Sequence, residues 1–182
     1  MSKVLLLGDS ITYYLPKSKI GNSSDVIYNR GIENIGIETY RNYVLPHTEY
    51  KRADIIVILI GINNILRPDC DYDSKESLDN LMIKYNTLVS DIKKESNAKL
   101  IIQSIYPTKK LDVNKKVEYI NKKLINYCKD NNIQYLNLYN DLILNGVLNK
   151  NYSNDGLHPN MEGYELITDK INKAIQSLNH NR

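Results

Sequence analysis

The 182-residue sequence contains no phenylalanine and no tryptophan, so tyrosine is the only aromatic residue available to its core. Isoleucine and leucine must supply most of the remaining core, and every buried tyrosine hydroxyl needs a hydrogen-bond partner. The two cysteines, Cys70 and Cys128, are too few for a disulfide framework and lack metal-ligand spacing, which favours free thiols in a reducing compartment. No repeat, low-complexity tract or linker interrupts the chain, so we expect one domain over residues 1–182.

Long apolar runs are also missing. The run at residues 4–7 is too short for a signal peptide or a spanning helix, and no other stretch approaches the length of roughly 20 residues that a membrane helix needs. We therefore expect no membrane insertion and a cytoplasmic protein, although a chain whose leader had been removed would look the same.

Neither sign of charge dominates. Lysine and arginine number 24 against 21 for aspartate and glutamate, a net charge of +3, and the signs are mixed along the chain. The densest basic cluster, at residues 109–110, 115–116 and 122–123, has spacings that suit exposed helix faces. This distribution indicates a solvated surface rather than a polyanion-binding one, so we expect no nucleic-acid partner.

Strand and helix patterns alternate along the chain. Apolar segments with strand character cover residues 3–7, 26–29, 54–60 and 99–104, and a weaker one covers 133–138. Apolar residues at three- and four-residue steps predict helices within residues 78–92, 113–128 and 164–178, the last with Asn160 as its N-cap, and a shorter helix at 36–45. This alternation predicts a three-layer α/β/α sandwich around a five-stranded parallel sheet.

Polar residues suited to chemistry follow several of these strands. Ser10 comes shortly after the first strand, Asn63 after the third, and Asp155 and His158 after the fifth. Because the carboxyl ends of parallel strands share one edge of the sheet, we expect these side chains to converge there. The least regular stretches, residues 67–73 and 142–158, are also places where a site is often carried.

These residue types meet the needs of acyl transfer. A serine hydroxyl is a weak nucleophile until a base takes its proton, and His158 can take it and later hand it to the leaving alcohol. Asp155, three residues earlier, is near enough to orient the imidazole. The Asn63 side-chain amide and backbone N–H groups can bind the developing oxyanion. Nothing in the sequence indicates a metal or an organic cofactor.

Three blocks in order resemble those of the SGNH hydrolases, also called the GDSL family. Residues 8–11 (G-D-S-I) resemble the GDSL block, with Ile for the usual Leu, 61–64 (G-I-N-N) the G-x-N-D block, and 155–159 (D-G-L-H-P) the D-x-x-H block. The I-Y-P turn at 105–107 is a further similarity. The resemblance implies a flavodoxin-like fold, a catalytic triad of Ser10, Asp155 and His158, and an oxyanion hole that includes the Ser10 amide and Asn63.

The sequence departs from the family pattern at two places. Asn64 stands where the family has an aspartate that supports the loop rather than reacts. The family also has a glycine five places after the asparagine that closes the second strand, and that place is Asn34 here, with Gly31 and Gly36 on either side. We expect Gly36 to donate the second oxyanion amide, with Gly31 and Asn34 as the alternatives.

Other interpretations of these residues remain open. Asp9 is expected to hold its loop by hydrogen bonds, but it could be the nucleophile of a phosphoryl-transfer enzyme, although the second aspartate of such loops is missing. Residues 10–12 could bind phosphate in a non-catalytic flavodoxin-like module or an inactive member of the family. Asp141 could replace Asp155 as the orienting acid. His47 is expected in a surface loop and His180 in a frayed tail.

The leading hypothesis is serine-dependent hydrolysis of a small-molecule carboxylic ester through an acyl-enzyme. A chain of this length leaves little material for a lid or a deep acyl tunnel, which favours a short acyl group, acetyl above all, on a polar or sugar-like alcohol. Lysophospholipase or thioesterase activity on longer acyl chains is the alternative, and an acyltransferase could use the same triad.

Overall fold

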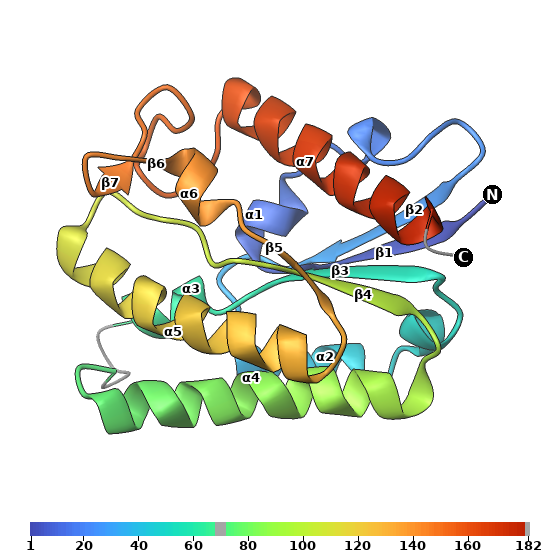
Figure 1. The fold of residues 1–182 in the computed structure, drawn as a ribbon, viewed down its shortest axis with the longest axis horizontal. Helices are drawn as coiled ribbons and strands as arrows, with labels where there is room; N and C mark the ends of the chain where they lie inside the picture. Colours follow the sequence, from blue (N-terminus) through green and yellow to red (C-terminus); the bar gives the residue numbers. More distant parts are fainter. Residues whose placement is uncertain (68–71, 181–182) are drawn as a thin grey trace.

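A five-stranded parallel sheet forms the middle of the computed structural model, which describes residues 1–67 and 72–180 (Figure 1). Its strands lie in the order β2-β1-β3-β4-β5, and each neighbouring pair is parallel. Their bounds are Lys3–Gly8 for β1, Val26–Gly31 for β2, Ile55–Leu59 for β3, Lys99–Gln103 for β4 and Gln134–Leu136 for β5. The predicted α/β fold with five parallel strands is confirmed.

Helices cover both faces of the sheet. In Figure 1 helices α1 and α7 lie on one side of it, and α4 and α5 lie on the other. The helices are α1 (Ser10–Tyr13), α2 (Ile37–Val44), α3 (Ile62–Leu66), α4 (Lys75–Glu95), α5 (Leu111–Asp130), α6 (Tyr139–Leu142) and α7 (Met161–His180). Asn160 caps α7 as predicted, because its Oδ1 accepts the Gly163 amide over 3.0 Å.

Alternation of side chains along the strands divides the core into two. Leu5 and Leu7 of β1 join Ile56 and Ile58 of β3 in one apolar cluster with α2, α4 and α5. The intervening residues of the same strands, together with Ile11 of α1, join a second cluster with α7. Strands buried on both faces need continuous apolar runs, which is the pattern of residues 55–60.

Several short elements gave no signal in the sequence. These are the hairpin of β6 (Ile143–Leu144) and β7 (Val147–Leu148), the 3-10 turns Lys17–Lys19 and Thr48–Lys51, and the helices α1, α3 and α6. An element of two to five residues spans at most about one helical turn, so no periodicity can mark it. The hairpin lies within the stretch predicted to be irregular.

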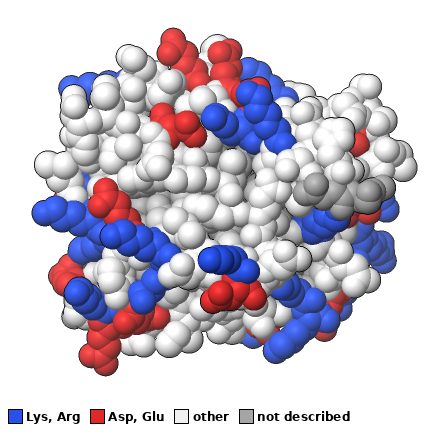
Figure 2. Space-filling model, in the orientation of Figure 1, with Lys and Arg blue, Asp and Glu red and all other residues white. Residues whose placement is uncertain are grey.

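The surface carries charged side chains of both signs. Figure 2 shows basic and acidic side chains interspersed on this face. Within residues 1–67 and 72–180, no helix has the length and apolar character to cross a membrane. No group of three or more His, Cys, Asp or Glu side chains gathers around a possible metal position in that part of the chain. Cys128 is a buried free thiol; Cys70 lies outside the described residues.

Candidate active site

Ser10 is the first residue of α1, directly after β1. The helix packs directly against β1 and β2, and a glycine on each strand allows it. A Cβ on Gly8 would stand 2.2 Å from Thr12 Oγ1, and one on Gly31 would stand 2.2 Å from the amide nitrogen of Tyr13. Any larger residue would push α1 outward and move the Ser10 hydroxyl with it.

His158 reaches Ser10 from the other end of the chain. Its Nε2 lies 3.1 Å from Ser10 Oγ, and its Nδ1 lies 2.7 Å from Asp155 Oδ2. The two residues are 148 positions apart in sequence, yet their side chains are within hydrogen-bond distance. A serine, an imidazole and a carboxylate in this linear order form the arrangement that activates a hydroxyl for attack on a carbonyl.

The loop around His158 is fixed by its own polar groups. Asp155 Oδ1 accepts the amides of Leu157 and His158, each over 2.8 Å. Ser153, which is buried, donates its hydroxyl to the His158 carbonyl over 2.7 Å and accepts the Gly156 amide over 3.0 Å. This network fixes the backbone that carries the imidazole ring.

The Asp155 carboxylate is held in its charged form. Its partial burial acts to raise the pKa, but the hydrogen bonds from the His158 ring and from the amides of His158 and Leu157 outweigh burial and place the pKa well below the usual value. A carboxylate that stays ionised can accept the Nδ1 proton of the imidazole and leave Nε2 free to act on Ser10.

Helix α7 also contacts the helical turn that begins with Ser10. The Tyr164 hydroxyl donates to the Ile11 carbonyl oxygen over 2.6 Å across a sequence separation of 153 residues. The apolar spacing of residues 164–178 predicts a core position for Tyr164 and no polar role. A buried tyrosine hydroxyl needs an acceptor, and the one it finds here lies in the first turn after Ser10.

Residues 33–37, between β2 and α2, are anchored by side chains from α3 and from the segment directly after it. Asn63 Nδ2 donates to the Ile35 carbonyl over 3.1 Å, and Arg67 Nη2 donates to the Asn34 carbonyl over 2.5 Å. Asn64 is buried and its Oδ1 accepts the Ile37 amide over 2.9 Å. This segment is thereby fixed beside Asn63, and it is named the oxyanion loop below for the role proposed for it.

The backbone amides of Gly31, Asn34 and Gly36, the three candidate oxyanion donors, differ in hydrogen bonding and in backbone conformation. The Gly31 N–H already donates to Asn29 Oδ1 over 2.9 Å, so it is used within β2. The carbonyl of Ile35 points to Asn63 Nδ2, and because carbonyl and N–H point in opposite directions across a trans peptide, the Gly36 N–H points away from the Asn63 amide. Asn34 has a left-handed backbone with φ of 55°. That conformation is typical of glycine, the residue the family resemblance places there.

Asp9, next to Ser10 in the sequence, is buried, with 1% of its surface exposed. Its Oδ1 accepts the Ile11 amide over 3.0 Å and caps α1, while Oδ2 has no hydrogen-bond partner within the described residues. Burial raises the pKa of this carboxyl to about 7. A carboxylate enclosed in this way is poorly placed to attack a phosphate, which argues against the phosphoryl-transfer interpretation.

The remaining candidates lie elsewhere. Asp141 forms an ion pair with Lys170 over 3.7 Å, and Asp155 is the carboxylate that contacts His158. His47 is an exposed loop residue whose ring lies edge-on to Tyr43 at 4.8 Å. His180 is the last residue of α7.

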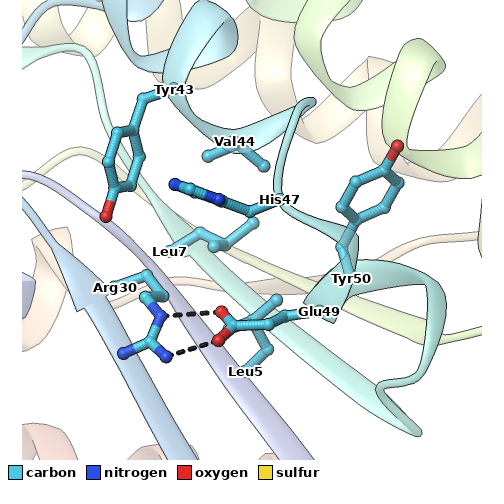
Figure 3. A pocket seen from close by; sticks show the side chains of 8 residues that line it. All are labelled: Leu5, Leu7, Arg30, Tyr43, Val44, His47, Glu49 and Tyr50. Atoms are coloured by element: carbon cyan, nitrogen blue, oxygen red, sulfur yellow. Dashed lines mark hydrogen bonds and ion pairs between the residues drawn. The ribbon is translucent and has the colours of Figure 1, made fainter.

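His47 also borders a small hollow that lies apart from the triad. Figure 3 shows Arg30 and Glu49 facing each other at this hollow, joined by two hydrogen bonds. Its interior leaves about 10 Å³ for the centre of a water molecule. That is room for one water, so the hollow is no substrate site.

Comparison with known proteins agrees with this geometry. The model of the GDSL-like lipase/acylhydrolase family matches residues 6–166. The chain belongs to this family. Membership of this family makes it an ester-hydrolysing enzyme. A comparison with curated proteins finds no significant match.

Three solved structures show how widely the fold of this GDSL-family chain is shared. A GDSL-like lipase from Bacteroides thetaiotaomicron superposes with a TM-score of 0.84 at 22% sequence identity. The match covers 97% of this chain and 89% of the lipase chain. A lipase/acylhydrolase from Enterococcus faecalis has a TM-score of 0.75 at 20% identity, covering 97% and 96%. An acetyl-xylooligosaccharide esterase mutant from Geobacillus has a TM-score of 0.73 at 16% identity, covering 93% and 92%.

Proposed function

We propose that this GDSL-family enzyme hydrolyses carboxylic esters with Ser10 as nucleophile, His158 as general base and acid, and Asp155 as the orienting carboxylate. The observation that supports this assignment most directly is the pair of short contacts on His158, 3.1 Å from Nε2 to Ser10 Oγ and 2.7 Å from Nδ1 to Asp155 Oδ2. The first distance lies within the reach of a proton transfer.

The reaction follows from these positions. Ser10 Oγ attacks the ester carbonyl carbon while its proton passes to His158 Nε2. The bond from that carbon to the alcohol oxygen then breaks, and the alcohol leaves with the proton from Nε2. Water attacks the acyl-enzyme, gives one proton to His158, and releases the acid as Ser10 regains its proton.

The negative oxygen of each tetrahedral intermediate needs donors that are already in place. The Ser10 amide lies in the first turn of α1, where helix amides have no intrahelical acceptor. The Asn63 side chain has a second N–H besides the one that binds the Ile35 carbonyl. For the third donor we assign the Asn34 amide rather than that of Gly36, because the Gly36 N–H points away from Asn63.

We further propose that the acyl group is short and that acetyl esters of polar alcohols are the substrates. The chain carries no lid or accessory domain in its described residues beyond the small β6–β7 hairpin. The Geobacillus structural relative is named for the removal of acetyl groups from xylo-oligosaccharides, which is the same chemistry.

The decisive experiment labels the protein with a fluorophosphonate probe and measures ester hydrolysis in parallel. The wild type should react with the probe and cleave 4-nitrophenyl acetate, and Ser10→Ala should lose both. Ser23→Ala, at an exposed serine in the turn before β2, serves as the matched control and should keep both. Retained turnover in Ser10→Ala would refute the assignment, and a rate that rises from C2 to C8 esters would refute the acetyl preference.

A further inference from the structure

Two adjacent tyrosines remain exposed directly after the buried first turn of α1. Tyr13 and Tyr14 expose 52% and 54% of their surfaces, while Ser10, Ile11 and Thr12 of the same helix are buried. The two rings pack edge to face with centroids 5.0 Å apart. Two neighbouring exposed aromatic rings, three and four residues after the proposed nucleophile, indicate a surface that can bind a ligand.

Tyr14 joins both halves of the proposed active site. Its ring lies edge-on to the His158 imidazole with centroids 6.2 Å apart. Its hydroxyl donates to Glu33 Oε1, at the start of the oxyanion loop, and this bond to a carboxylate raises the pKa of the Tyr14 hydroxyl. An aromatic face and an exposed carboxylate therefore stand together beside the catalytic imidazole.

The chemistry of the proposed reaction says which part of the substrate lies there. His158 Nε2 must protonate the departing alcohol oxygen, so that oxygen lies next to the imidazole. The oxyanion donors, Asn63 and the oxyanion loop, act on a different oxygen of the same carbon. The Tyr14 ring lies edge-on to this imidazole, with centroids 6.2 Å apart, and is thus close to the departing alcohol oxygen.

We propose that Tyr14 and Glu33 form the subsite for the alcohol part of the ester, and that this subsite binds a neutral polyhydroxylated ring such as a pyranose. This inference rests on the function proposed above. The C–H face of a sugar ring packs on an exposed aromatic ring, and its hydroxyls donate to a carboxylate. A phosphate-bearing alcohol is disfavoured, because Glu33 places a like charge beside it.

The test compares kcat/KM for an acetylated methyl xyloside with kcat/KM for ethyl acetate, whose alcohol is too small to reach Tyr14. Proton release at constant pH measures both reactions. Tyr14→Ala should lower this ratio at least tenfold, mainly through KM on the sugar ester. Tyr14→Phe, which keeps the ring, should stay within threefold of the wild type. Tyr28→Ala, a partly exposed tyrosine on β2, is the matched control and should leave the ratio unchanged.

A second experiment tests whether the negative charge of Glu33 disfavours phosphate-bearing alcohols. Glu33→Gln should raise kcat/KM for acetylated glycerol phosphate relative to ethyl acetate at least threefold, and raised salt should shrink that gain. An unchanged ratio in Tyr14→Ala, an equal loss in Tyr14→Phe, or a wild type that cleaves ethyl acetate but no sugar acetate would overturn the subsite. A wild type that neither reacts with the fluorophosphonate nor cleaves ethyl acetate would instead refute the proposed function itself.

Discussion

The amide of Ile37 donates to Asn64 Oδ1 over 2.9 Å, so a side chain of α3 caps the start of α2. Asn64 stands where the family pattern has aspartate, and one oxygen acceptor is what this bond requires. The exchange of aspartate for asparagine therefore keeps the anchor of the oxyanion loop and removes a buried charge.

Asn64→Ala removes this anchor. Loss of the acceptor leaves the buried Ile37 amide without a partner, which should lower the free energy of unfolding by about 1–3 kcal/mol. Because the oxyanion loop is then less constrained, kcat on 4-nitrophenyl acetate should fall as well. Urea unfolding and initial rates measure both effects. Asn42→Ala, at an exposed position of α2, is the control, and equal behaviour of the two variants would contradict the anchoring role.

Asn34→Gly distinguishes a backbone donor from a side-chain donor at this position. Glycine keeps the amide and adopts φ of 55° without strain, so activity should remain within about twofold of the wild type. Asn34→Ala should also stay active but lose about 1 kcal/mol of stability, because alanine resists the left-handed conformation. A hundredfold loss of kcat in Asn34→Gly would show instead that the side chain acts on the oxyanion.

Asp155→Asn should abolish most of the activity while the fold persists. An amide cannot hold the imidazole in the required tautomer, and removal of such a carboxylate lowers kcat by roughly 10⁴. Because folding lowers the pKa of Asp155, its stabilising effect is present above its ordinary pKa and is lost as the pH falls through the folded value. Acid titration should accordingly unfold the wild type more steeply than Asp155→Asn, and identical acid transitions would count against this.

Asp9→Asn should change how stability depends on pH. Folding raises the pKa of Asp9 from 3.8 to about 7, so the folded protein keeps this proton over a range in which the unfolded chain has lost it. The free energy of unfolding should therefore fall between pH 4 and 7, by up to about 4 kcal/mol at roughly 1.4 kcal/mol per pKa unit. Asparagine keeps an oxygen to cap α1 and removes the titration.

Urea unfolding at pH 4.5 and pH 7.5 measures this difference, with Asp130→Asn, at the exposed end of α5, as the control. A wild type and an Asp9→Asn variant with the same slope against pH would show that the Asp9 carboxyl ionises normally in the folded protein.

The sequence predicted secondary structure where apolar residues repeat regularly, and site residues where a motif follows a strand. Apolar runs and helical spacing predicted the five strands and the four longer helices, and the positions of Ser10, Asp155 and His158 after strand ends predicted that they would meet. The contacts around them were not predictable. The bonds of Tyr164 to Ile11 and of Arg67 to Asn34 join residues whose spacing carries no period.

The third donor proposed for the oxyanion shows the same limit. Gly36 was the expected choice because a short insertion in this loop costs little. The direction of an N–H, however, depends on where the neighbouring carbonyl is held, and here Asn63 holds that of Ile35. Asparagine tolerates the left-handed φ that Asn34 adopts, but no pattern in the sequence predicts that conformation at this position.

The long span between Ser10 and His158 has a consequence for biosynthesis. A ribosome releases Ser10, the proposed nucleophile, early and His158 near the end. Tyr164, which binds the first turn of α1, follows later still. Nascent or truncated chains therefore lack a competent base even if the sheet has begun to assemble. Reaction with a serine-directed probe would thus report the fully formed molecule, and could serve as a readout of folding as well as of catalysis.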